Sequence, residues 1–169
     1  MASQLTMHAP PSPAEWRAAM GYFPTGVTIV TSWDGASPVG STINAFSSVS
    51  LSPPLLLICL ARENPIREPV LESGVFGVNI LGCEAEPLAH RFAALDVVDR
   101  FEGHPFSAAD DGAPQLAAAP VFIDCAVEAA HAAGDHLVVI GRGLRTCHAS
   151  ASAPLLYHRS RFPRFDPNG

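Results

Sequence analysis

Long apolar runs are missing from this 169-residue sequence. The longest covers residues 55–61, whereas a membrane-spanning helix needs about 20 apolar residues. The opening residues, MASQLTMHAPPSP, also lack the basic start and apolar centre of a secretory signal peptide. We therefore expect a cytoplasmic protein that makes no membrane contact.

Positive charge is scarce. Ten Lys and Arg residues stand against 16 Asp and Glu residues, which gives a formal net charge of −6 at pH 7. Such a balance excludes a nucleic-acid groove, because phosphate backbones are held by clustered cations. The 48% apolar content is typical of one globular domain, which we place at residues 12–166 after a flexible tail at 1–11.

Metal motifs are also absent. The four cysteines are widely spaced, with no C-x-x-C pair and no Cys/His cluster at zinc spacing. Cys59 and Cys125 lie in apolar runs, which favours buried, inert thiols in a reduced protein. His131 and His136 lie five residues apart across an expected turn, which is poor metal-ligand spacing. We expect no metal site.

Common catalytic fingerprints are missing too. The sequence has no Walker loop, no Rossmann glycine fingerprint, no H-E-x-x-H and no G-x-S-x-G. The missing G-x-S-x-G excludes an esterase nucleophile elbow.

Strands dominate what is present. β-Branched residues fill 26–33 before the turn signal Asp34-Gly35, and 38–46 returns as a second strand. Further strands are predicted at 54–61, 74–81 and 154–165, with a long hairpin at 121–130 and 136–148. This order, without β-α-β alternation, predicts a mainly β, antiparallel barrel of six or seven strands.

Helices are expected to be few and peripheral. Ser12 and Glu15 form a capping box, with Pro13 at the first helical position, so a helix should run to about Gly21. Short helices are predicted at 65–73, where Pro69 interrupts the pattern, and at 84–94. Residues 95–118 look irregular.

A dense set of hydroxyl and amide side chains precedes the apolar strand at 54–61. It forms either an exposed turn or a polar cradle for a ligand rich in acceptors. Its members are Ser41, Thr42, Asn44, Ser47, Ser48, Ser50 and Ser52.

Isolated charged residues leave their roles open. His136 begins a strand directly after Gly134-Asp135, where it is either a solvated turn residue or a group that handles a proton near neutral pH. Arg62 follows a buried strand and either binds a phosphate or is an exposed charge. Taken singly, His158, Arg159 and Arg161 are typical of surface charge.

Seven segments together resemble the flavin reductase-like family, the FMN-binding split barrels. They are FPTGVTIVTS, GSTINAFSSVSLSPPLLLICLAR, SGVFGVNIL, HRFA, DRFEG, GDHLVVIG and PLLYHRSRF, in the family's order and spacing over about residues 16–165. The resemblance implies a Greek-key split barrel and a homodimer. It also implies an NAD(P)H:flavin oxidoreductase that uses FMN or FAD with NADH or NADPH and supplies reduced flavin to a partner monooxygenase.

The resemblance also implies a flavin site. Thr42, Ile43 and Asn44 would meet the isoalloxazine edge, and Ser47 and Ser48 the ribityl chain and phosphate. Other residues would form the floor of the site, hold the phosphate or close the site: Cys59, Leu60, Ala61, Arg62, Phe92, Tyr157 and Arg161. His136 would contact the nicotinamide or the flavin edge during hydride transfer.

One stretch departs from the family pattern. The family's S-x-T phosphate motif is replaced by Asn64 and Ile66 in RENPIRE, so phosphate binding weakens, shifts to Arg67 or favours a different flavin. FMN and FAD both stay open. Two other functions also remain: a non-catalytic flavin carrier, and a flavoenzyme that retains FMN and reduces another substrate.

Overall fold

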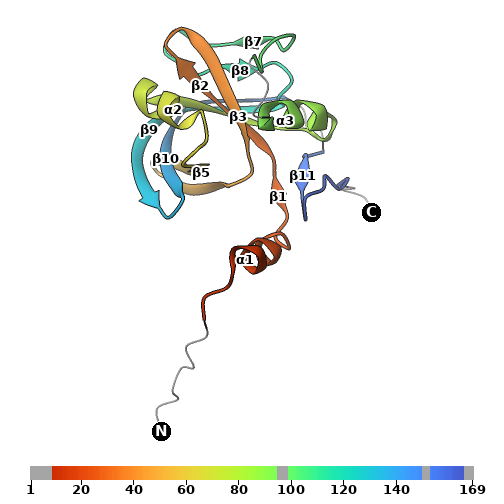
Figure 1. The fold of residues 1–169 in the computed structure, drawn as a ribbon. Helices are drawn as coiled ribbons and strands as arrows, with labels where there is room; N and C mark the ends of the chain where they lie inside the picture. The colour runs from red at the N-terminus through yellow and green to blue at the C-terminus, as the bar shows by residue number, and fades with distance from the viewer. Residues whose placement is uncertain (1–8, 95–98, 150–152, 166–169) are drawn as a thin grey trace.

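A seven-stranded antiparallel sheet forms the body of the protein in the computed structural model, which describes residues 9–94, 99–149 and 153–165 (Figure 1). The strand order is β3-β2-β6-β9-β10-β5-β4. The bounds are β2 (Thr28–Asp34), β3 (Ser37–Ile43), β4 (Phe46–Leu51), β5 (Pro54–Ala61), β6 (Val75–Ile80), β9 (Val121–Ala133) and β10 (His136–His148).

Two small sheets and three helices complete the fold. The small sheets pair β1 (Thr25–Gly26) with β11 (Leu156–Tyr157) and β7 (Phe106–Ser107) with β8 (Gln115–Leu116). The helices are α1 (Pro13–Met20), α2 (Arg67–Ser73) and α3 (Glu86–Ala93), the last preceded by a 3-10 turn, η1 (Cys83–Ala85). No helix in the described part of the chain is long and apolar enough to cross a membrane.

The mainly β prediction is confirmed, including the expected strand at 54–61. Four details differ. The terminal strand expected at 154–165 forms only as β11, over Leu156–Tyr157. β4 continues through the hydroxyl-rich stretch, β9 extends to Ala133, and part of the supposedly irregular 99–118 segment pairs as β7 and β8. The edge strands β3 and β4 follow each other in the chain, but their pairing does not close a ring among the described residues. The expected tail falls largely on residues 1–8, outside the described residues.

Side chains along β5 alternate between the core and the outer face of the sheet. Leu56, Ile58 and Leu60 are buried in the main hydrophobic cluster, and each such side chain contributes about 1.5–3 kcal/mol of burial free energy. Leu57 and Cys59 point the other way and are only partly covered. β5 therefore serves the core with one face and leaves an apolar wall on the other.

Helix α1 projects away from the sheet, and the chain enters the body through β1 (Figure 1). Its capping box is formed as the sequence predicts: Ser12 Oγ accepts from the Glu15 amide at 3.3 Å, and the Ser12 amide donates to Glu15 Oε2 at 2.8 Å. No residue of α1 is buried, and Trp16 and Met20 are 57% and 51% exposed. Local hydrogen bonds rather than core packing hold this helix.

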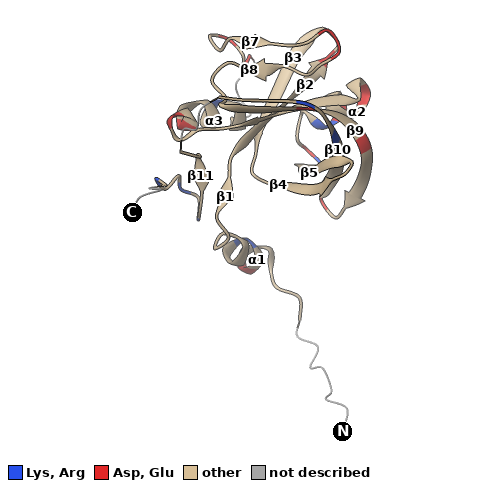
Figure 2. Ribbon diagram, turned by 180° about the vertical axis from the view of Figure 1, so that it is seen from behind, with Lys and Arg blue, Asp and Glu red and all other residues tan. Residues whose placement is uncertain are grey.

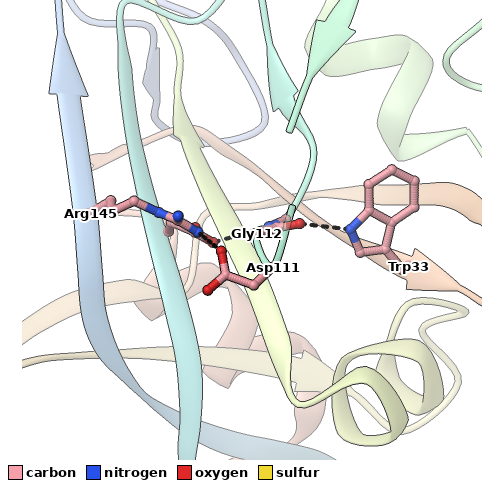
Figure 3. Close-up of polar contacts among 6 residues, drawn as sticks. Trp33, Asp111, Gly112 and Arg145 are labelled. Carbon is pink, nitrogen blue, oxygen red and sulfur yellow. Dashed lines mark hydrogen bonds and ion pairs between the residues drawn. The ribbon is translucent and has the colours of Figure 1, made fainter. Parts of the chain in front are cut away.

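The segment around β7 and β8 is fastened to the main sheet through a buried carboxylate. Asp124 on β9, 1% exposed, accepts from the Ala113 amide at 3.1 Å and from Arg145 Nε at 3.0 Å. Figure 3 shows Arg145 also reaching Asp111, and Trp33 Nε1 donating to the Gly112 carbonyl at 2.8 Å. These polar contacts explain why the segment is ordered despite its irregular sequence.

Candidate functional site

A large cavity lies between α1 and the strands β4 and β5. Its volume is about 920 Å³, within the range of small-molecule sites. The partly covered face of β5 contributes the apolar wall, and the residues before β1 and after β11 complete the rim. The lining includes polar, charged and sulfur-containing side chains that could contact a ligand: Arg17, Asn44, Ser47, Cys59, Tyr157 and Arg159.

A smaller cavity of about 330 Å³ lies next to the first, between β3 and α3. The two share Asn44, Tyr157 and Ser160 as lining residues. Thr42 and His90 line only the smaller one. Because they share these residues, the two cavities adjoin, and we call them the large and the small compartment of one candidate site.

The structure brings five of the sequence-predicted residues to this site. They are Thr42, Asn44, Ser47, Cys59 and Tyr157. Four of them lie on the strands β3, β4, β5 and β11, and Asn44 lies in the connection between the edge strands β3 and β4. The hydroxyl-rich stretch is therefore at least partly a cavity wall.

Polar groups here already have local partners. Thr42 Oγ1 donates to the Ala89 carbonyl at 2.7 Å, and Asn44 Nδ2 contacts Thr25 Oγ1 at 3.3 Å. Ser47 and Ser48 are exposed, but only Ser47 lines the cavity. The Asn44 amide keeps an oxygen and a second hydrogen for a ligand.

Three predicted residues turn their side chains into the core. Ile43 and Leu60 are buried in the main cluster. Phe92 is fully buried in a second cluster, where its ring packs edge-on against the Phe101 ring with 5.0 Å between the centroids. The Phe92 ring also lies against Gly40, where an added Cβ atom would come within 2.7 Å of the ring. Burial leaves the Phe92 ring no face toward either cavity, so it supports β3 instead of closing the site.

Predicted phosphate ligands have other partners. Arg62 Nη2 donates to the Gly134 carbonyl at 3.0 Å, and Arg67 pairs with Glu68 at 2.6 Å. Asn64 bridges Ser41 and the start of α2, with its Nδ2 3.1 Å from Ser41 Oγ. None of the three lines either cavity.

His136 lies beside the cavity wall. It pairs with Ala61 of β5, while Val138, two residues along β10, pairs with Cys59. Residues two apart share a face of the sheet, so the His136 side chain stands on the same face as Cys59, roughly 7 Å along the strand. Its side chain is 44% exposed and lines neither cavity directly.

Asp135 fixes the orientation of this imidazole. His136 Nδ1 is 2.7 Å from Asp135 Oδ1, and because a carboxylate only accepts, Nδ1 carries the hydrogen of that bond. The hydrogen bond and the charge of His136 lower the pKa of Asp135 below its ordinary value. Nε2 of His136 is therefore the ring nitrogen left for a ligand.

The thiol that lines the cavity is inert. Burial raises the pKa of Cys59, so the thiol stays neutral at physiological pH. A neutral sulfur on an apolar wall suits contact with a flat, uncharged ring system. Cys59 is one of four cysteines that are all free.

Among the lining residues that sequence reasoning missed are Arg17, Arg159 and Ser160. Arg159 is exposed, as the sequence predicts, and it also lines the cavity, because the chain after β11 passes beside it. Arg161, which was predicted to close the site, is exposed and lines neither cavity. No turn signal in YHRSRF marks Arg159 and Ser160, because Arg-Ser is not a favoured turn pair.

Comparison with protein families gives one match over most of the chain. Residues 20–166 match the family described as flavin reductase like domain. The reductase subunit of a flavin-dependent monooxygenase from Rhodococcus jostii is 35% identical over 92% of this chain and 80% of its own. An NADH-dependent FAD reductase from Streptomyces globisporus is 34% identical, with 94% and 89% coverage.

Solved structures agree. The Streptomyces globisporus NADH:FAD oxidoreductase in complex with NAD and FAD fragments superposes with a TM-score of 0.87 at 34% identity, covering 96% of this chain and 98% of that one. Component B of nitrilotriacetate monooxygenase from Mycobacterium thermoresistibile gives a TM-score of 0.85 at 33% identity, with 90% and 86% coverage.

Proposed function

This chain belongs to the flavin reductase-like family, and on that premise we propose that it is an NAD(P)H:flavin oxidoreductase that supplies reduced flavin to a partner monooxygenase. The observation that carries the proposal is the family match over residues 20–166 together with a nucleotide-sized cavity walled by β5. Flavin, when bound, accepts a hydride at N5 from C4 of the nicotinamide.

The cavity suits a flavin. Leu57, Cys59 and Phe46 offer a flat apolar wall for the ring system, and Asn44 and Ser47 offer donors and acceptors for its polar edge and side chain. Arg17 and Arg159 supply positive charge, and no Asp or Glu is among the described lining residues. In a chain with a net charge of −6, this cavity matches an anionic, partly aromatic ligand.

The protein's own part in the reaction is positioning. The wall formed by β5 orients the ring system, and the His136 imidazole, held by Asp135, offers Nε2 to the nicotinamide carboxamide or to the flavin edge. Hydride transfer needs no protein nucleophile and releases no proton. Bringing the two reacting atoms within about 3–3.5 Å is the main demand on the site.

Turnover with and without added flavin tests this function. We expect oxidation of NADH or NADPH, followed at 340 nm, to depend on added FMN or FAD. A coloured protein that oxidises NADH without added flavin would indicate a flavoenzyme that retains its flavin. Flavin binding without NADH or NADPH oxidation would indicate a carrier.

We also propose a homodimer. Large apolar side chains are exposed on α1 and just after it, with Tyr22 65% and Phe23 72% exposed, and on the edge strand β4, with Leu51 94% exposed. Edge strands and helices with such surfaces need a covering partner. A second copy bound there also borders the cavity, because Tyr22 and Phe23 line it.

We also propose a cytoplasmic location. The four free cysteines support it, because thiols usually stay unpaired in a reducing compartment.

A further inference from the structure

The turn after β11 has an unusual backbone. His158 and Arg161 form a two-residue bridge, with His158 N donating to Arg161 O at 2.9 Å and Arg161 N to His158 O at 3.0 Å. The two residues between them, Arg159 and Ser160, have positive φ values of 51° and 62°. Two-residue hairpin turns of this kind favour Asn-Gly or Gly-Gly, because most side chains disfavour positive φ.

This strained turn stands at the cavity. Arg159 lines the large compartment, and Ser160 lines both compartments. The paired strands β1 and β11 lie between α1 and the sheet in both ribbon views (Figure 1, Figure 2), and the turn follows directly after β11 in the chain. Non-glycine residues held at positive φ concentrate at functional sites, where the side chain repays the strain.

Backbone hydrogen bonds fix the turn against the end of α1. Arg159 N donates to the Gly21 carbonyl at 3.2 Å, and Gly21 N donates to the Arg17 carbonyl at 3.0 Å. Gly21 thereby links the backbones of Arg17 and Arg159, and both arginines line the large compartment. The two cations are delivered to one cavity by separate ends of the chain.

The Arg159 guanidinium lies over the Tyr22 ring, and no carboxylate among the described residues pairs with it. Its Cζ lies 4.6 Å from the centroid of the Tyr22 ring, so one face of the planar group is stacked. Stacking leaves the N–H donors along its edge available, and these suit two phosphate oxygens at once. Within the described ranges, no salt bridge involves Arg17 or Arg159, unlike Arg67, Arg142 and Arg145.

We propose that the Arg159–Ser160 turn, together with Arg17, is the phosphate-binding element for a nucleotide of the reaction. This inference rests on the proposed function. The shared chemistry is a nucleotide phosphate, which both the flavin nucleotide and the nicotinamide dinucleotide carry. Arg159 supplies the bidentate contact, Arg17 adds charge, and Ser160 allows close approach because its side chain is small.

A purely structural role for Arg159 explains less. The contact with Gly21 uses the backbone, which any residue supplies, and Tyr22 is an exposed ring whose stacking alone contributes little. Neither contact explains why an arginine occupies this strained position. Neither explains why the described lining residues of the cavity include no Asp or Glu.

Paired ligands with and without phosphate test the element. Affinities of FAD, FMN and riboflavin, and of NAD⁺ and nicotinamide riboside, are measured by calorimetry for the parent protein, Arg159→Gln and Arg17→Gln. We expect Arg159→Gln to weaken a phosphorylated ligand by about 10- to 100-fold and its phosphate-free counterpart by less than about 2-fold, because charge-assisted hydrogen bonds are lost. Arg17→Gln should act in the same direction, with a smaller loss.

The two ligand series identify the source of the phosphate. A loss confined to FMN and FAD assigns the turn to the flavin, and a loss confined to NAD⁺ assigns it to the nicotinamide dinucleotide. Unchanged affinities in both series, or riboflavin and FMN weakened equally, overturn the proposal.

A control variant accompanies the test. Arg164→Gln removes an exposed cation that follows the turn in the sequence and lines neither cavity. It should bind all five ligands within about 3-fold of the parent, because it removes no donor from the cavity lining. An equal loss in Arg164→Gln would show a general charge effect and would also overturn the proposal. Absence of flavin-dependent NADH and NADPH oxidation in the parent protein would instead contradict the proposed function.

Discussion

Arg62 donates a hydrogen bond from Nη2 to the carbonyl oxygen of Gly134, 3.0 Å away and 72 residues further along the chain. The Arg62 amide also donates to the Asp135 carbonyl at 2.9 Å. The end of β5 is thus tied to the turn that carries His136. Arg62 holds the position of that turn, and the phosphate contact expected from the sequence stays a prediction.

Replacing Arg62 by Gln should loosen this turn. We expect kcat/KM for NADH to fall by about 3- to 10-fold, because a misplaced His136 no longer orients the nicotinamide. FMN affinity should change by less than about 2-fold, measured by fluorescence titration. A large loss of FMN affinity with an unchanged reduction rate would show instead that Arg62 reaches the flavin phosphate.

His136→Ala tests the imidazole itself. The variant should lose about 10-fold or more in kcat/KM for the nicotinamide donor, near 1.4 kcal/mol of transition-state stabilisation, with flavin affinity almost unchanged. Stopped-flow reduction of flavin by NADH and by NADPH measures the step. Asp135→Asn, which keeps the imidazole but weakens its hydrogen bond, should lie between the parent and His136→Ala. Parent-like reduction rates in both variants would make His136 a turn residue only.

Asn44 lines both compartments, so its amide is the most central polar group of the site. Asn44→Leu keeps the side-chain volume similar and removes the donor and acceptor. Losing one such partner costs about 1–3 kcal/mol, which corresponds to a 5- to 150-fold loss of flavin affinity. Fluorescence titration measures it, and Ser48→Ala, outside both linings, is the matched control. Equal affinities for parent and Asn44→Leu would place the flavin elsewhere.

The buried carboxylate of Asp124 should stabilise the fold through its contacts with Ala113 and Arg145. Asp124→Asn keeps the shape but removes the charge that Arg145 pairs with, so the free energy of unfolding should fall by about 1–3 kcal/mol. Urea unfolding at neutral pH measures this. Asp111→Asn removes an exposed partner of the same arginine and should have a much smaller effect.

The contact between Asp111 and Arg145 predicts how the stability of the protein changes with pH. The hydrogen bond and charge of Arg145 lower the pKa of Asp111 from its ordinary value of 3.8. A lowered folded-state pKa contributes stability that is present above the unfolded pKa and is lost as the pH falls through the folded pKa. The urea midpoint of Asp111→Asn should therefore approach that of the parent as the pH is lowered below about 4. A constant difference between pH 6 and pH 3 would contradict this assignment.

The exposed apolar surface predicts assembly. In sedimentation experiments at micromolar concentration we expect a species of about twice 17.8 kDa. Leu51→Arg, at the most exposed apolar position of β4, should shift the protein toward the monomer by placing a charge in the interface. A monomeric parent, or a Leu51→Arg dimer as tight as the parent, would place the interface elsewhere or exclude it.

Local chemistry let the sequence determine much of the fold. The Ser12–Glu15 capping box, the turn at Asp34-Gly35 and the apolar strand at 54–61 depend on neighbouring residues, and all three form in the structure. The order and spacing of segments such as GSTINAF and GDHLVVIG identify the family from the sequence, and the family match over residues 20–166 confirms it.

Only the tertiary structure decided where individual side chains go. Alternation along β5 sends Leu60 into the core and leaves Cys59 on the cavity wall, and the packing of α3 on β3 buries Phe92. Arg62 and Arg67 find partners outside the cavity, while Arg159 enters it through a turn that the sequence does not signal. The direction of a side chain depends on strand register and on contacts between residues far apart in the chain, and neither can be read from one segment alone.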